Sequence, residues 1–410
     1  MPTTISQQLL QKLSKQISGE LFFDNLHKSI YATDASVYRK IPLAVAYPKD
    51  KEDIKKLIAF ATEQGITLIP RTAGTSLAGQ CVGDGIIVDV SKHFTKLLAF
   101  DEKARTVTVE PGIIRDELNH FLNSYGLFFA PNTSTSNRCM IGGMVGNNSS
   151  GTTSIQYGVT RDKVLELDTI LSDGSEVTFG TINHDKLIDK QQGNHLENKI
   201  YKSIYSVLCR EDIQQEIRNE FPKMSIHRRN TGYAVDCLLN SSMFSETEIP
   251  FNISKLLCGS EGTLAFTTAI TLQLDVLLPP KKIVVEAHFN SIQESMEAVL
   301  IAMKHNLYTC ELMDKTILDC TKNNREQLKN RFFVEGNPQA ILLLEVCADT
   351  DKEVETLAKN LIEDLKANKF GYAYPQLYNE DINKATALRS AGLGLLGNIV
   401  GDAKAVACIE

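Results

Sequence analysis

The chain has 410 residues, of which 43% are hydrophobic and 23% charged, a composition typical of a globular protein with two or three domains. Its formal net charge is −7 and its basic runs are pairs such as Lys281-Lys282, which argues against a nucleic-acid-binding surface. Nine cysteines are scattered without a Cys-x-x-Cys pair, which argues against zinc, iron–sulfur and disulfide frameworks and predicts reduced thiols in a cytoplasm.

Residues 1–40 predict a helical lead-in, because Leu9, Leu10, Leu13 and Ile17 recur at helical spacing. The N-terminus has no basic start followed by an apolar block, so it does not have the pattern of a secretory signal.

The first clear unit of the chain is a predicted helix followed by a predicted strand, at residues 50–69. Asp50 is a candidate N-cap, one apolar face follows it, and Gly65 ends the helix. Residues 66–69 then predict a short strand.

A glycine-polar loop, residues 71–80 (RTAGTSLAGQ), follows that strand. Free backbone N–H groups in such a run can form a nest that binds an anion. The loop lacks the GxxxxGK[ST] pattern, and a strand at residues 86–90 follows it where a Rossmann loop would run into a helix. A plain connection between two strands is the alternative interpretation.

A second glycine cluster follows a second helix and strand. Residues 106–110 predict a strand, residues 114–122 a helix, and residues 127–130 a short strand. In the stretch 131–158, four glycines fall within ten positions and are interleaved with Thr, Ser and Asn. Because glycine permits close approach and the polar side chains can bond a ligand, the stretch predicts a cofactor cradle, with a long surface loop as the alternative.

The third cluster is Gly259-Ser-Glu-Gly-Thr263. It comes after a hairpin at residues 164–179 and a mostly helical region at 181–255, and it precedes a strand at 265–274. Three clusters of similar chemistry are better explained by one extended polyanionic ligand than by three unrelated loops.

The pattern changes at Pro279-Pro280, after which strands and helices alternate. This rhythm predicts an antiparallel sheet with helices on one face. His288 lies in an apolar strand without a nearby partner at ligand spacing, so we interpret it as a satisfied core or surface histidine. The apolar run 391–401 is shorter than the roughly 20 residues that span a bilayer, and residues 403–410 predict a strand.

Four motifs together carry a resemblance to a known family. RTAGTSLAGQ, PNTSTSNRCMIGGMVGNNSSG, NTGYA and GSEGTL, in this order, resemble the FAD-binding domain of the vanillyl-alcohol-oxidase and para-cresol-methylhydroxylase flavoproteins. The resemblance is closest to FAD-linked D-2-hydroxyacid dehydrogenases, which act on D-lactate, glycolate or D-2-hydroxyglutarate. It implies an α+β fold in which two subdomains clamp FAD and an antiparallel cap domain holds the substrate.

The resemblance also implies domain bounds. The helical lead-in spans residues 1–40, the FAD-binding domain 41–278 with subdomains 41–110 and 111–278, and the cap 279–410, incomplete at its C-terminal end.

Carried onto this sequence, the resemblance implies a set of FAD-binding residues. The pyrophosphate would be bound by residues of the first loop, namely Arg71, Gly74, Thr75 and Ser76, with Gly79 and Gln80 beside it. The flavin and its ribityl chain would be lined by Pro131, Thr135, Ser136, Gly142, Gly143, Ser150 and Gly151. The adenine and ribose side would be closed by Glu261, Gly262 and Thr263, and Gly232 and Tyr233 would approach the flavin or the substrate. Some relatives attach FAD through a histidine in the first loop. Thr75 and Ser76 offer none, so we expect non-covalent FAD.

Oxidation of a 2-hydroxy acid requires a cation for the carboxylate, a base for the hydroxyl proton, and a flavin placed over the Cα hydrogen. Arg389 is the expected cation because its planar fork matches a carboxylate and because it matches a substrate arginine of the family. An arginine on a solvated helix face is the alternative. Lys404 is a second candidate cation, and Asn230 would approach the flavin or the substrate.

The resemblance places the base and a divalent metal in a histidine-rich segment downstream of these residues, so no metal site is expected within them. We therefore expect these 410 residues to be the N-terminal part of a longer polypeptide, which in some relatives is fused to an iron–sulfur module. Electrons would pass from FAD to a quinone, a cytochrome or an iron–sulfur centre. The expected location is the cytoplasm or the periphery of a membrane. A homodimer is compatible with these expectations. An FAD-using transferase of the ether-lipid synthase type and a non-catalytic flavin-binding module are the alternatives.

Overall fold

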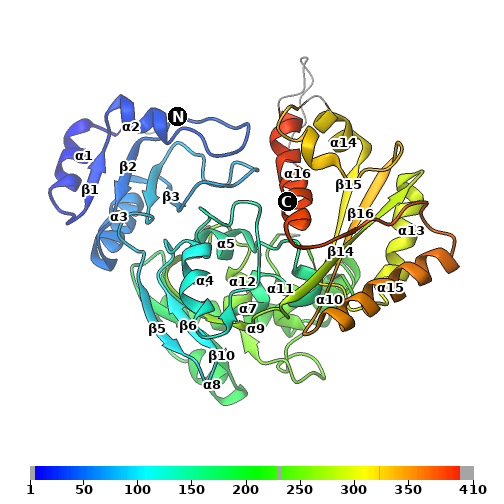
Figure 1. The fold of residues 1–410 in the computed structure, drawn as a ribbon. Helices are drawn as coiled ribbons and strands as arrows, with labels where there is room; N and C mark the ends of the chain where they lie inside the picture. Colours follow the sequence, from blue (N-terminus) through cyan, green and yellow to red (C-terminus); the bar gives the residue numbers. More distant parts are fainter. Residues whose placement is uncertain (1–4, 227, 230–231, 323, 398–410) are drawn as a thin grey trace. The chain divides into compact units, whose positions relative to one another are not determined.

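The computed structural model describes residues 5–226, 228–229, 232–322 and 324–397, which form two compact units (Figure 1). The first unit contains residues 5–150 and 158–276, and the second contains residues 151–157 and 277–397. Each unit has its own sheets and its own apolar core.

The first unit begins with a four-stranded sheet in the order β1-β2-β4-β3. Its strands are β1 (Glu20–Phe22), β2 (Ala44–Tyr47), β3 (Leu68–Arg71) and β4 (Ile86–Asp89). β1 is antiparallel to β2, whereas β2 and β3 both run parallel to β4. The glycine-polar loop thus joins two neighbouring parallel strands without an intervening helix, unlike a Rossmann loop.

Three helices accompany this sheet, namely α1 (Gln7–Ser14), α2 (Asn25–Ile30) and α3 (Lys51–Gln64). The expected ends of α3 are confirmed, because Asp50 caps its start and Gly65 ends it with a φ of 63°. Ile54 and Leu57 are fully buried against the sheet. Each contributes about 1.5–3 kcal/mol through burial.

The second sheet of the first unit is antiparallel, in the order β5-β6-β12-β8-β9. Its strands are β5 (Leu97–Asp101), β6 (Thr106–Val109), β12 (Phe266–Gln273), β8 (Val164–Ile170) and β9 (Glu176–Phe179). The predicted hairpin is confirmed as β8 and β9, with Leu167 opposite Phe179. The central strand β12 follows the third glycine cluster directly, so this cluster is anchored to the middle of the sheet.

Short strands and helices complete the first unit. They are α4 (Arg115–Asn123), β7 (Leu127–Phe128), α5 (Ile141–Asn147), α7 (Thr160–Lys163), β10 (Thr181–Ile182), α8 (His184–Lys190), α9 (Leu196–Leu208), α10 (Glu211–Glu220), α11 (Val235–Leu239), β11 (Phe251–Asn252), α12 (Ser254–Leu257) and β13 (Asp275–Val276). β7 pairs with β13, and β10 pairs with β11.

The second unit is built on an antiparallel sheet in the order β15-β16-β14-β17. Its elements are α6 (Ser154–Tyr157), β14 (Lys281–Phe289), α13 (Ile292–Ala302), β15 (Thr309–Asp314), α14 (Lys315–Lys322), the 3₁₀ turn η1 (Leu328–Arg331), β16 (Ala340–Ala348), α15 (Asp351–Ala367), β17 (Gln376–Leu377) and α16 (Asn379–Gly397).

Helices cover both faces of this sheet, which corrects the expectation of helices on one face. α13 and α15 pack on one face of β14 and β16, and α14 and α16 pack on the other (Figure 1). Leu318, Ile382 and Leu388 form the second core with sheet residues such as Leu343. The strand predicted for residues 403–410 lies outside the described residues.

Two negative findings hold for the described residues. No helix there is long and apolar enough to cross a bilayer. All eight cysteines in these ranges are free thiols.

Two polar side chains lie buried on β14, on the face that α16 covers. His288 is satisfied, because its Nδ1 lies 2.8 Å from the Glu286 carbonyl oxygen and its Nε2 accepts from the Glu335 N–H at 3.2 Å. Burial lowers the pKa of this imidazole, so it is neutral, as expected of a core histidine. The carboxyl group of Glu286 is different, since it is fully buried and neither oxygen has a hydrogen-bond partner among the residues that the structure describes.

Burial raises the pKa of Glu286 well above its ordinary value of 4.5. A carboxyl group with a raised pKa in the folded state stabilises that state below pH 4.5 relative to higher pH, and this contribution is lost as pH rises through the folded-state pKa. The stability of Glu286→Gln relative to the wild type should therefore rise between pH 5 and pH 8, by about 1.4 kcal/mol for each pH unit between 4.5 and the folded-state pKa. Urea unfolding at pH 5 and pH 8 measures the difference.

Glu297→Gln, on the exposed side of α13, is the matched control and should change stability equally at both pH values. A Glu286→Gln variant whose stability relative to the wild type is the same at pH 5 and pH 8 would contradict a neutral buried Glu286.

Candidate functional site

The first glycine cluster is an open backbone loop at the end of β3. Among the described residues, none accepts a hydrogen bond from the backbone N–H groups of residues 73–77. Gly74 and Gly79 have φ values of 67° and 77°, which suit glycine. The Ser76 hydroxyl donates to the Gln80 side chain at 2.5 Å, which closes the loop from within. These N–H groups are therefore available as donors for the anion nest that the sequence predicts.

The Arg71 side chain lies against this loop, close to Gly74. Its guanidinium donates to the Thr33 carbonyl at 2.9 Å and lies 4.8 Å from the centre of the Tyr31 ring. A Cβ at Gly74 would come within 2.5 Å of the Arg71 guanidinium, which is the flexible end of its side chain, so position 74 favours glycine mainly for its φ.

The second cluster includes the start of α5. Within the segment before it, the Ser136 hydroxyl donates to Asp116 at 2.9 Å, and the Thr135 carbonyl accepts from Cys139 N at 2.8 Å. Pro131 accepts from Arg115 Nε at 3.0 Å. These three predicted cofactor residues therefore also hold their own segment in place.

Two glycines of α5 allow close packing. A Cβ at Gly143 would lie 2.6 Å from the Thr72 hydroxyl of the first cluster. A Cβ at Gly142 would lie 2.4 Å from Pro111 Cβ and 2.9 Å from its carbonyl oxygen. The start of α5 thus lies against the first loop, at a distance that larger residues would not permit.

The third cluster packs onto the other end of α5. Gly259 N donates to the Val145 carbonyl at 2.9 Å, and Glu261 N donates to the Gly146 carbonyl at 2.8 Å. The last carbonyls of a helix have no partner within it, and here the third loop supplies one. Glu261 adopts a φ of 55°, which is uncommon for a residue other than glycine.

Side chains join the third cluster to the first. Gln80 Nε2 donates to the Glu261 carboxylate in a short hydrogen bond. Gly262, with a φ of 73°, lies over Pro70, and a Cβ there would come within 3.0 Å of Pro70 Cγ. The three clusters, which are far apart in sequence, therefore meet around α5.

Of the remaining predicted site residues, some lie near the third cluster and others lie outside the described residues. Tyr233 lies near the third cluster, where its hydroxyl is 2.6 Å from that of Thr263, and the neighbouring Gly232 has a φ of 82°. Ser150 is the last residue of the first unit before residues 151–157, the segment that begins with Gly151 and belongs to the second unit. Asn230 and Lys404 lie outside the described residues.

Arg161 is a buried anchor that the sequence reasoning missed. Its guanidinium donates to the Lys255 carbonyl at 3.0 Å and to the Cys258 carbonyl at 2.6 Å, just before the third cluster. Its backbone N–H donates to Asn148 Oδ1 at 2.8 Å, where Asn148 ends α5 with a φ of 55°. Arg161 thus fixes the third loop to the end of α5. Nothing in the local sequence distinguishes it from a surface arginine.

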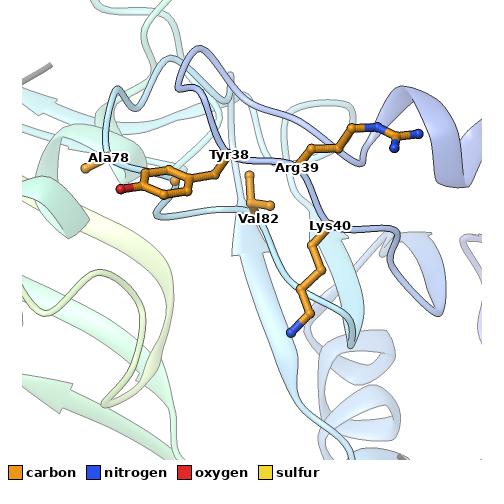
Figure 2. Close-up of a pocket in the computed structure, with 6 residues that line it drawn as sticks. Tyr38, Arg39, Lys40, Ala78 and Val82 are labelled. Carbon is orange, nitrogen blue, oxygen red and sulfur yellow. The ribbon is translucent and has the colours of Figure 1, made fainter. Parts of the chain in front are cut away.

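A pocket of about 290 Å³ lies beside the first loop (Figure 2). Its lining residues are Tyr38, Arg39, Lys40, Ala78, Gly79 and Val82. Figure 2 shows the Tyr38 ring directed toward Ala78, whereas the Arg39 and Lys40 side chains point away from it. Lys40 forms an ion pair with Asp84 at 2.8 Å. The polar groups here do not converge, so the pocket is a less suitable ligand site than the loop itself.

The residues present fit a dinucleotide cofactor. The nest of residues 73–77 offers unpaired donors for a pyrophosphate, and the hydroxyls of Thr75, Ser134 and Ser150 make no hydrogen bond within the described ranges. Gly142 and Gly143 let α5 lie close to Pro111 and to Thr72 of the first loop, which keeps the clusters together. No group of three or more His, Cys, Asp or Glu side chains suited to a metal ion occurs among the described residues.

In the second unit, the predicted substrate cation Arg389 is ion-paired. Its guanidinium contacts the carboxylate of Glu311 on β15, and the two side chains are 31% and 16% exposed. Both nitrogens of His288 are occupied in the core, which leaves this histidine unsuited to the role of base.

The packing of α5 leads to a prediction on two of its glycines. Gly142→Ala should lower the free energy of unfolding of the FAD-free protein by about 1–3 kcal/mol, because its methyl group meets Pro111. Gly146→Ala is the matched control, since its Cβ would lie 3.8 Å from the nearest atom, in ordinary contact. Alanine also favours a helix by up to about 1 kcal/mol. Urea unfolding followed by circular dichroism compares them, and equal stability of the two variants would contradict the packing described.

Comparisons with known proteins agree with this geometry. Residues 42–180 match the FAD binding domain, and residues 278–410 match the C-terminal domain of FAD linked oxidases. D-2-hydroxyglutarate dehydrogenase of Haemophilus influenzae is 31% identical over 97% of this chain and 39% of its own length. Glycolate oxidase subunit GlcD of Bacillus subtilis is 34% identical over 43% of this chain and 37% of its own length.

Nearly the whole chain thus spans about two fifths of the length of the D-2-hydroxyglutarate dehydrogenases that it matches. Among solved structures, alkyldihydroxyacetonephosphate synthase superposes with a TM-score of 0.63 at 15% identity, over 97% of this chain and 65% of that one. This likeness shows a shared fold. The chain thus combines the FAD binding domain with the C-terminal domain of FAD linked oxidases, the two family domains that its sequence matches.

Proposed function

We propose that this chain binds FAD non-covalently and takes part in the oxidation of a D-2-hydroxy acid to the 2-oxo acid. The observation that carries the proposal is the meeting of three glycine clusters around α5, with unpaired backbone donors at residues 73–77. Relatives named for the oxidation of D-2-hydroxyglutarate and glycolate support the substrate class.

In this proposal, residues 41–278 bind FAD and residues 279–410 contribute to the substrate site. The amides of residues 73–77 would hold the pyrophosphate, because a nest of N–H groups stabilises an anion without a charged side chain. The second glycine cluster would line the flavin side, and Glu261 to Thr263 would close the adenine and ribose side. Bound FAD would supply an acceptor for the hydride of the substrate Cα.

Arg389 would bind the substrate carboxylate, since a guanidinium offers two parallel donors to it. Orientation of the carboxylate fixes the position of the neighbouring Cα, which is the protein's contribution to hydride transfer. The electrons would pass to a quinone, a cytochrome or an iron–sulfur centre.

A transferase that uses FAD without net oxidation is the second candidate. The fold shared with alkyldihydroxyacetonephosphate synthase supports it, but at 15% identity this likeness concerns the fold alone. The two candidates differ in one property, since only the dehydrogenase takes electrons from a hydroxy acid.

Anaerobic reduction of the FAD-loaded chain tests the proposal. D-2-hydroxyglutarate, D-lactate and glycolate are each added to the protein, and the flavin absorbance near about 450 nm is followed. We expect at least one of them to bleach the band, with no bleaching by L-2-hydroxyglutarate, L-lactate or an acyl dihydroxyacetone phosphate. Arg389→Met should raise KM about 10- to 100-fold, the effect of losing a hydrogen-bonded charge.

Arg325→Met is the matched control, because Arg325 is an exposed arginine of the same unit. Retained FAD that no 2-hydroxy acid reduces would reject the dehydrogenase and favour the transferase or a non-catalytic flavin-binding module. Failure of the wild-type chain to bind FAD would reject all three.

A further inference from the structure

Arg389 lies at the border between the buried and exposed sides of α16. Ile382, Ala385 and Leu388 recur at helical spacing and are buried against the sheet, and Arg389 follows the last of them. One residue turns a helix by about 100°. The Arg389 side chain therefore leaves the buried side at its edge, where it is partly open to solvent.

Glu311 lies on the matching side of the sheet. It is in β15, an edge strand, opposite Leu343 of β16, which is itself opposite Glu286 of β14. Residues directly opposite one another in a sheet point to the same face. Leu343 packs with the α16 residues, so Glu311 also faces α16, and its carboxylate contacts the Arg389 guanidinium.

This ion pair has the chemistry that the proposed function assigns to the substrate. A 2-hydroxy acid brings one carboxylate to Arg389, and Glu311 already places another there. Glu311 is tethered by the fold, so its effective concentration near Arg389 is fixed and independent of substrate concentration. A ligand that binds only the open form has its apparent affinity reduced by the fraction of open molecules.

We propose that Glu311 is a resident carboxylate that competes with the substrate for Arg389 and so sets the affinity for 2-hydroxy acids. The inference rests on the proposed function only in its assignment of Arg389 to the substrate carboxylate. When the substrate displaces Glu311, the ion pair between Arg389 and Glu311 is replaced by one between Arg389 and the substrate carboxylate. No covalent bond is formed or broken, and no proton is transferred. The pair therefore favours substrates whose carboxylate binds better than a tethered glutamate.

The alternative role for Glu311 is to align Arg389 for the substrate, and it predicts the opposite sign. If Glu311 competes, removal of its charge frees Arg389 and KM falls. If Glu311 aligns the guanidinium, its removal loosens Arg389 and KM rises. The sign of one measured change therefore separates competition from alignment.

Glu311→Gln in the FAD-loaded chain provides the test, because glutamine keeps the size and removes the charge. We expect KM for the D-2-hydroxy acid that reduces the wild type to fall about threefold to tenfold. The dissociation constant of oxalate, measured through its perturbation of the flavin absorbance, should fall by a similar factor. A KM and an oxalate constant that rise or stay the same would overturn the proposal.

Glu363→Gln is the matched control, since it removes one negative charge from an exposed site on α15, on the opposite side of the sheet. We expect it to leave both constants unchanged. An equal fall in this control would attribute the effect to net charge and reject a specific role for Glu311.

Two further measurements keep the outcome decisive. If Glu311→Gln does not retain FAD, Glu311→Asp takes its place, because the shorter acid weakens the pair, and KM should then fall by a smaller factor. A KM that does not fall would contradict competition. If no 2-hydroxy acid reduces the wild type, the proposed function fails, yet the oxalate titration of both variants still tests Glu311 by itself.

Discussion

The candidate site depends on how the last turn of α5 satisfies its carbonyl groups. A helix leaves its final carbonyls without partners, and in α5 two of these accept from Gly259 N and Glu261 N. This backbone contact brings the third glycine cluster to the second. The Gln80 side chain then joins the first cluster to Glu261. Loss of the α5 end would therefore separate the second cluster from the third, whose bonded residues Val145 and Gly259 lie 114 positions apart in sequence.

The glycines serve this arrangement in two different ways. Gly142 and Gly143 are required by the space beside α5, because a Cβ would meet Pro111 or Thr72. Gly74 and Gly262 are also required by their backbone conformation, since both have positive φ. Counting glycines in the sequence detects glycines required by close packing and glycines required by a positive φ, but does not separate the two. Only the folded structure shows whether a substitution would cause a steric clash or a strained backbone conformation.

Sequence patterns predicted much of the fold and the elements that carry the site. The capped helix α3, the hairpin of β8 and β9, and the long strands β12 and β14 were predicted because each has a clear period and a clear end. The short strand β1 and the edge strands β5 and β15 were not predicted, since β1 has only three residues and the other two are mostly exposed or half-buried, which leaves no clear apolar alternation. The second helical face of the cap sheet was also missed.

The contacts that complete the site were beyond the sequence. Arg161 resembles any surface arginine in the sequence, yet it is buried and fixes the carbonyl groups before the third cluster. Arg389 was predicted as a cation, but its pairing with Glu311 depends on an edge strand that no pattern indicated. Contacts between side chains of distant segments follow from register and helix rotation, and local periodicity contains neither.

The central claim is that the three clusters form one FAD cradle, and amide hydrogen exchange tests it most directly. The FAD-free and FAD-loaded chains are compared by mass spectrometry, with exchange resolved for residues 73–77 and 259–263. The amides of residues 73–77 have no acceptor among the described residues, whereas four of the five at 259–263 are already hydrogen-bonded. FAD should therefore slow exchange strongly in the first segment and add to the protection of the second. Tight FAD binding with unchanged exchange at residues 73–77 would contradict the account.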